Sequence, residues 1–163
     1  RFYYLGAVAW APPESKTTAR VAAILGYGKF DRSNNFNNPN LIDYVFTHKL
    51  TDKLTYAFEF LYGWQNDVPD VGYAKWYHFV NYLTYKFDDK WSTTGRVEFF
   101  DDVDGNRTGF KGFYNSYTLG VTWKPCDAIM IRPEVRYDRC LNNTPFDGQK
   151  DFFGGMINAI FLW

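Results

Sequence analysis

Several features are missing from this sequence, and each absence excludes a class of protein. No stretch approaches the ~18 consecutive apolar residues that a transmembrane helix needs. Basic and acidic residues balance at 18 each, so the chain lacks the positive excess with which proteins bind nucleic-acid phosphates. The segment that begins at Arg1 has no basic region followed by an apolar core and a cleavage site, so we expect no signal peptide in it.

Cysteine is scarce, with Cys126 and Cys140 as the two examples. They flank a segment that we expect to be one extended strand, which at ~3.3 Å per residue would hold them ~45 Å apart. A disulfide bond needs a far shorter separation. We therefore expect two unpaired thiols at strand ends, with a redox or metal-binding pair as the alternative.

The usual signatures of catalysis are also missing. His48 and His78 lack metal-ligand spacing, and there is no glycine-flanked serine nucleophile, Cys/His dyad or phosphate-binding glycine loop. The acidic run 101–106 fails the EF-hand pattern, because Phe100 and Lys111 would occupy positions that require carboxylates. We expect a hairpin tip there, with a weak surface cation site as the alternative. No enzyme, cofactor or metal is predicted, although a Ser/His pair assembled from distant strands stays open.

Aromatic residues, in contrast, are abundant: 16 Phe, 13 Tyr and 6 Trp make up 21% of the chain. A soluble domain packs such rings into one core, whereas a membrane barrel also places them on its lipid-facing surface and at both interfaces. The mean hydropathy of -0.40 is compatible with a barrel, since every second residue of a barrel strand faces water.

Nine segments have the length and composition of strands. They are longer than the ~5 to 6 residues typical of soluble sheets and suit tilted membrane-spanning strands. The expected strands are residues 2–10, 17–28, 41–50, 53–63, 76–87, 91–100, 115–124, 128–139 and 152–163.

Side-chain character alternates with a period of two in these segments. In 53–63 one face carries Leu54, Tyr56, Phe58, Phe60 and Tyr62, and the other carries Thr55, Ala57 and Glu59. The strands 91–100 and 128–139 alternate in the same way. One face suits hydrocarbon and the other suits water, which favours a membrane barrel over a soluble antiparallel sheet.

The connections alternate between short and long. Short links fall at 11–16, 51–52, 88–90 and 125–127, and long polar loops at 29–40, 64–75, 101–114 and 141–151. This is the outer-membrane pattern of periplasmic turns and extracellular loops. We therefore predict an all-β fold, an antiparallel up-and-down transmembrane β-barrel, with 1–163 as a single domain in the bacterial outer membrane and a periplasmic C-terminus.

The last predicted strand ends on the aromatic Trp163, where outer-membrane barrels more often carry Phe, and we expect it to be the feature that the barrel-insertion machinery reads. An accidental aromatic terminus on an ordinary strand is the alternative. Nine strands are an odd number, whereas bacterial barrels have an even number. We therefore expect the C-terminal part of a larger barrel of about 16 strands, without its N-terminal strands. An eight-stranded barrel preceded by a lead-in segment, 1–16, is the alternative.

The face opposite the apolar series is predicted to line the pore, because a lipid-facing Arg at the bilayer midplane costs ~2 to 4 kcal/mol. The densest charges lie on the sixth and eighth strands, where they form either a wall with a transverse field or a ladder of stabilising ion pairs. Pro133 should produce a bulge or a break in the eighth strand. The predicted pore-lining residues are Arg20, Asp43, Lys49, Glu59, Lys86, Arg96, Glu98, Lys124, Arg132, Glu134, Arg136 and Asp138.

Five runs in the second half of the chain are distinctive: WYHFVNYLTYK at 76–86, RVEFFDDVDGNRTG at 96–109, YTLGVTWKPC at 117–126, IRPEVRYD at 131–138 and PFDG at 145–148. In these runs the chain resembles the OmpL-like β-barrel porin family of the bacterial outer membrane. The resemblance is specific from Leu41 to Trp163 and implies a porin longer than this chain, with no catalytic or ligand-binding residues to transfer. The terminal Trp and the short upstream sequence depart from it and leave pore size open.

The predicted function is passive diffusion of small hydrophilic solutes and ions across the outer membrane. One alternative is a narrow structural or adhesive barrel with a filled lumen, which acts through its extracellular loops. Another is a soluble lipocalin-like binder. Expected partners are membrane lipid, lipopolysaccharide, the permeating solutes, the insertion machinery and other copies of the chain, but no nucleic acid.

Overall fold

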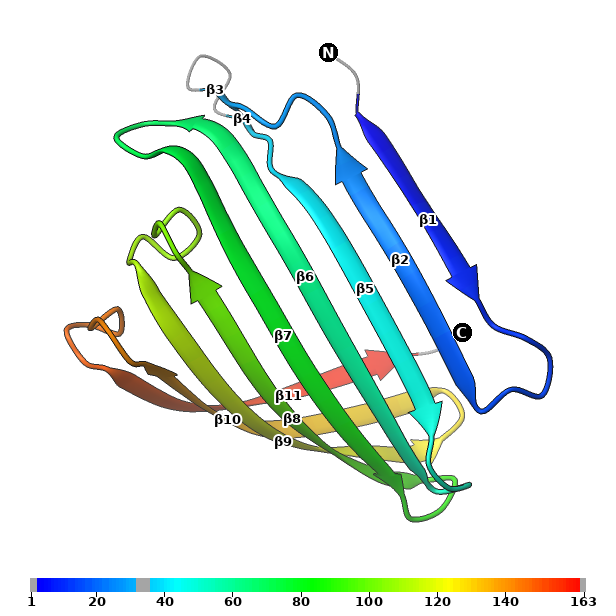
Figure 1. Cartoon of the computed structure of the whole chain (residues 1–163). Coiled ribbons are helices and arrows are strands. Elements are labelled where there is room, and N and C mark those ends of the chain that lie inside the picture. The colour runs from blue at the N-terminus through cyan, green and yellow to red at the C-terminus, as the bar shows by residue number, and fades with distance from the viewer. Residues whose placement is uncertain (1–2, 32–35, 162–163) are drawn as a thin grey trace.

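The computed structural model describes residues 3–31 and 36–161, and in them the fold is all-β. Nine strands form one antiparallel sheet in which successive strands are neighbours, in the order β1-β2-β5-β6-β7-β8-β9-β10-β11, and the sheet curves into an open trough (Figure 1). The strands are β1 (Tyr4–Trp10), β2 (Thr17–Leu25), β5 (Asn40–Lys49), β6 (Leu54–Val68), β7 (Gly72–Lys86), β8 (Trp91–Asp102), β9 (Gly112–Cys126), β10 (Ile129–Cys140) and β11 (Asp151–Phe161).

These strands confirm the nine predicted ones, with shifts at their ends. Two further strands of two residues each, β3 (Phe30–Asp31) and β4 (Phe36–Asn37), pair with one another within the predicted loop 29–40. Trp163, the predicted insertion signal, lies outside the described residues. None of the described residues forms a helix of the length and apolarity needed to cross a membrane.

The predicted loop 64–75 is wrong in its extent. β6 continues to Val68 and β7 begins at Gly72, so a tight turn replaces most of the loop, closed by a hydrogen bond from Val71 N to Val68 O at 3.2 Å. The sequence pattern did not predict this hairpin, because polar residues such as Gln65 and Asp67 end the apolar alternation. The backbone pairing between β6 and β7 nevertheless continues. Hydrogen bonding between strands does not require a lipid-facing side.

The register of the sheet gives it two chemically different faces. Arg96 lies opposite Tyr82 on β7 and Thr118 on β9, and residues that are directly opposite point to the same side. We call this the inner face. The residues at the alternate positions of each strand, such as Phe79 on β7 and Leu119 on β9, point to the opposite side, the outer face.

Burial places the inner face on the concave side of the trough. On the inner face Val80 and Thr118 are 1% and 8% exposed, whereas their chain neighbours on the outer face, Phe79 and Leu119, are 41% and 56% exposed. In a curved sheet the side chains on the concave side crowd one another. The concave side is therefore polar and charged, and the convex side is aromatic and aliphatic, the reverse of a soluble sheet that wraps an apolar core.

Aromatic pairs link neighbouring strands along the outer face. Phe58 and Phe60 each lie beside Phe79, with ring centroids 5.3 and 4.7 Å apart, and Trp91 stacks on Trp123 at 5.5 Å. Cross-strand aromatic pairs of this kind stabilise a sheet by ~0.2 to 1 kcal/mol each. They also cover the convex side with rings.

The two outermost strands of the sheet, β1 and β11, are each paired on one side within the described residues. Because nine strands alternate in direction, β1 and β11 run the same way. The links β1–β2, β5–β6, β7–β8 and β9–β10 lie at one end of the sheet, which we call the turn end. The connections β2–β5, β6–β7, β8–β9 and β10–β11 lie at the other, the loop end, where the tight β6–β7 turn is the shortest (Figure 1).

Pro133 produces no break on the β11 side, where it pairs with Ile157 and the register continues through it. The register of β10 with β9 shifts instead between Ile129 and Ile131. The expected irregularity therefore lies just before the proline. A missing N–H removes one hydrogen bond but does not force an extra residue into the strand.

The two cysteines are both free thiols, as predicted, but their surroundings differ. Cys126 at the turn end is exposed, and Cys140 at the loop end is buried beside Gly112. We expect a maleimide to label the detergent-solubilised protein once at Cys126 and a second time after denaturation. Mass spectrometry measures this, and Cys126→Ser should abolish labelling of the folded protein. Two adducts before denaturation would contradict the burial of Cys140.

Candidate functional site

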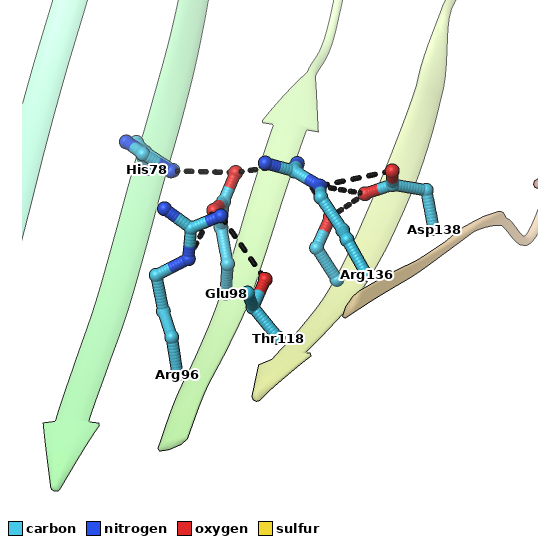
Figure 2. Close-up of polar contacts among 7 residues, drawn as sticks. His78, Arg96, Glu98, Thr118, Arg136 and Asp138 are labelled. Atoms are coloured by element: carbon cyan, nitrogen blue, oxygen red, sulfur yellow. Dashed lines mark hydrogen bonds and ion pairs between the residues drawn. The ribbon is translucent and has the colours of Figure 1, made fainter. Parts of the chain in front are cut away.

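The inner face carries a network of charged side chains centred on Glu98 of β8 (Figure 2). Its carboxylate lies 3.2 Å from His78 Nε2 of β7 and 3.5 Å from Arg136 NH2 of β10. Arg96 Nε, on the same strand, lies 3.6 Å from the second carboxylate oxygen. One acidic group thus meets three nitrogen-bearing side chains that come from three strands.

Arg136 extends the network to Asp138 and Ser116. Its Nε donates hydrogen bonds of 2.7 and 2.9 Å to the two carboxylate oxygens of Asp138, and its NH2 group lies 3.1 Å from the Ser116 hydroxyl. The Ser116 hydroxyl in turn donates to Asp138. Arg96 NH2 donates to the Thr118 hydroxyl at 3.1 Å. The network, defined as His78, Arg96, Glu98, Ser116, Thr118, Arg136 and Asp138, spans the wall from β7 to β10.

Alternation explains why these side chains meet. Glu98 pairs with Ser116, and Ser116 pairs with Asp138, so the three lie in one row across β8, β9 and β10. Residues two positions along a strand lie in the next row on the same face. The short side chain of Ser116 leaves room for Arg136 to reach over β9 to Glu98.

All twelve residues predicted to line a pore share the inner face, judged by their pairing partners. The structure brings Arg96, Glu98, Arg136 and Asp138 into the network, and it forms a separate ion pair between Arg20 and Asp43 at 2.9 Å. Within the part of the chain that the structure describes, Lys49, Glu59, Lys124, Arg132 and Glu134 have no ion pair within 4.0 Å, and Lys86 pairs with Asp89 at 2.6 Å. Their role in a pore stays a prediction.

The sequence prediction of the network missed His78, Ser116 and Thr118. His78 was considered as a metal ligand, but its position relative to Lys86 on the same strand already placed it on the inner face. Ser116 and Thr118 lie an even number of positions from Lys124 on the same strand, so they share its face. This even spacing could have placed all three residues on the inner face. Their contacts with Glu98, Arg96 and Arg136 depend on the register between strands.

One loop folds over the inner face at the loop end. In residues 103–111, Asn106 donates to Gln65 Oε1 at 2.9 Å, and the Arg107 guanidinium lies 5.0 Å from the Trp76 ring. Asp102, fully buried, accepts hydrogen bonds of 3.0 and 2.8 Å from the backbone N–H groups of Arg107 and Thr108. Gln65 and Trp76 both belong to the inner face, so this loop covers part of the concave side.

The turn end is rich in lysine. Lys86 hydrogen-bonds to Asp89, and this bond, with the positive charge behind it, lowers the pKa of the Asp89 carboxyl. At the loop end a matching contact exists between Lys29 and Asp67 at 2.7 Å, which raises the pKa of Lys29. Both pairs are exposed, so solvent screens them and they contribute little to stability.

The chemistry of the inner face is that of charge and hydrogen bonding. No group of three His, Cys, Asp or Glu side chains in residues 3–31 and 36–161 could hold a metal ion. The hypothetical cation site at 101–106 has Asp102 engaged by its own loop. The arrangement can hold ions, water and polar solutes against the wall.

Residues 3–162 match the family model described as "Putative beta-barrel porin-2, OmpL-like". The match includes the N-terminal strands, where the resemblance read from the sequence was loose. Comparisons with curated proteins and with solved structures gave no match.

Glu98→Gln should destabilise the protein by about 2 kcal/mol, because it removes the charge that Arg96 and Arg136 share. Glu59→Gln is the matched control, since Glu59 also lies on the inner face but makes no ion pair within the described chain. Denaturant unfolding of both variants in detergent measures the difference. Equal losses would contradict a stabilising role for the network.

Proposed function

The chain belongs to the OmpL-like family of β-barrel porins, and on that premise we propose that it forms part of the wall of a channel for passive diffusion of small hydrophilic solutes and ions. A porin family implies the bacterial outer membrane. The observation that carries the proposal is the division of the sheet into a charged concave face and an apolar convex face. Water against the concave side would solvate its charges, and lipid against the convex side would cover its apolar side chains.

The spacing of the outer aromatic residues supports a membrane-spanning position. On β9, Phe113 and Trp123 lie on the outer face near its two ends and are separated by ~33 Å of strand at ~3.3 Å per residue. At a tilt of ~40° this corresponds to ~25 Å along the membrane normal, the height of the apolar band of outer-membrane barrels. The turns would then lie in the periplasm and the long loops outside the cell.

The edges of the sheet support a larger, closed barrel. Backbone groups that face lipid unpaired cost several kcal/mol each, so β1 and β11 need partners within the membrane. They run in the same direction, and pairing them directly would create a parallel contact in an antiparallel barrel. An odd number of further strands removes this conflict, and seven of them complete the barrel of about 16 strands, wide enough for an aqueous channel.

In this channel the inner charges interact with permeating solutes and no bond is made or broken. The network of Glu98, Arg96 and Arg136 lies across the wall between the two ends, where it orients polar solutes through its field. Lipid and lipopolysaccharide would contact the outer rings, and other copies of the protein would associate through the same surface.

The channel is tested by reconstituting the full-length protein into planar bilayers, where we expect discrete steps of ionic current. A heat-denatured preparation serves as the control for membrane leakage. Absence of steps from folded protein would refute the proposed function.

Membrane placement is tested by a pair of adjacent substitutions. Leu83→Arg puts a charge on the outer face and should cost ~2 to 4 kcal/mol of folding free energy in lipid vesicles. Thr84→Arg puts the same charge on the inner face, against water, and should cost less. Vesicle-refolding titrations measure both, and a larger cost for Thr84→Arg would contradict the assignment of faces.

A further inference from the structure

Two hollows lie next to each other on the inner face, between the network and the turn end. The first, of about 330 Å³, lies over Gly120, and the second, of about 480 Å³, lies at the turn end. Thr122 lines both of them. The hydroxyls of Thr84, in the second, and Thr94, in the first, are hydrogen-bonded at 2.9 Å. The two hollows are therefore neighbours along the wall, with Thr122 between them.

The turn-end hollow has a surplus of positive charge. Five lysines and three aspartates line it: Lys49, Lys53, Lys86, Lys90 and Lys124 with Asp52, Asp88 and Asp89. Two of the acids are already engaged. Asp89 pairs with Lys86, and Asp88 Oδ1 accepts hydrogen bonds of 2.8 Å from the backbone N–H groups of Lys90 and Trp91.

Three lysines of this hollow have neither an ion pair nor a hydrogen bond from the side chain within the described residues, while Lys53, which also lacks a carboxylate partner, donates to the Phe87 carbonyl at 3.2 Å. No carboxylate within the described residues lies within 4.0 Å of the ammonium groups of Lys49, Lys90 or Lys124. Lys49 and Lys124 are the last inward-facing charges of β5 and β9 before the turns. A field of one sign in a water-filled recess concentrates ions of the opposite sign.

The Gly120 hollow combines guanidinium groups with hydroxyls. Two guanidinium groups, Arg96 and Arg132, line it with one acid, Glu134; Arg96 also lies 3.6 Å from Glu98 of the network, whereas Arg132 has no ion pair within the described residues. The hydroxyl-bearing lining residues are Tyr82, Thr94, Thr118 and Thr122. The hollow exists because Gly120 has no side chain. A Cβ placed there would have Glu134 Cβ, at 3.5 Å, as its nearest neighbour, so a larger residue would enter the open space.

We propose that the two hollows form a binding track for small organic anions that carry hydroxyl groups, such as hydroxycarboxylates. The lysines of the turn end attract the carboxylate, and Arg96 and Arg132 hold it while the threonine hydroxyls exchange hydrogen bonds with the hydroxyls of the solute. A guanidinium pairs with a carboxylate through two parallel hydrogen bonds, which a halide cannot form. This inference rests on the proposed function and names the solute class that the channel favours.

The track is tested on full-length protein in planar bilayers under a potassium chloride gradient, with gluconate as the hydroxylated anion. We expect the reversal potential to show preference for anions and gluconate to reduce the chloride current as it occupies the track. Lys49→Gln combined with Lys124→Gln should lower the anion-to-cation permeability ratio about two- to fivefold, the size expected for wet, partly screened charges. Lys111→Gln with Lys150→Gln, at the loop end, is the matched control and should leave the ratio unchanged.

A second pair of variants tests the Gly120 hollow without changing charge. Gly120→Val fills the hollow and should raise the gluconate concentration needed for half-inhibition several-fold. Gly95→Val makes the same change on the outer face, where a Cβ meets nothing within 4 Å, and should not alter inhibition.

The outcomes separate the two proposals. Folded protein without conductance would overturn the channel and the track together. Conductance without anion preference, or preference that the Lys49/Lys124 change leaves intact, would overturn the track alone. Equal inhibition by gluconate in the Gly120→Val and Gly95→Val variants would also overturn it.

Discussion

Antiparallel hydrogen bonding that joins each strand to the next, from β1 to β11, is the interaction on which the rest of this structure depends. It fixes the register, and the register decides which side chains share a face. If β8 or β10 slipped by one residue relative to its neighbours, Glu98 or Arg136 would turn to the convex side. The same slip in β7 would turn Phe79 to the concave side. The strong chemical difference between the faces therefore holds the register in place.

The inner network follows from that register and from the proximity of water. Glu98 would be costly to bury alone, because a desolvated carboxylate loses several kcal/mol of hydration. Here it faces the basic side chains Arg96 and Arg136 and the imidazole of His78, on an open concave surface that water can reach. Such a network ties β7, β8 and β10 together across the intervening β9, which backbone pairing alone does not do.

Sequence patterns predicted the nine strands and the division of their faces, since both follow from a period of two that needs no knowledge of the fold. They predicted that Arg96, Glu98, Arg136 and Asp138 share a face, but not that Arg136 reaches across β9 to Glu98. That contact depends on the relative register of three strands and on the small size of Ser116. The hairpin of β6 and β7 was underestimated because Gln65 and Asp67 lack an apolar alternation. The inward fold of loop 103–111 depends on single contacts, such as that of Asn106 with Gln65, which composition does not encode.

The two ends of the trough are unlike one another. At the loop end, residues 103–111 lie over the inner face and contact Gln65 and Trp76. At the turn end, Lys49, Lys90 and Lys124 line a hollow and have no carboxylate partner within the described residues. In the channel proposed above, fixed charge near one mouth and a loop over the inner face near the other would make mobile ions accumulate under one polarity of voltage and be depleted under the opposite one. Such a channel would rectify: it would pass current more readily in one direction than in the reverse, without any moving part.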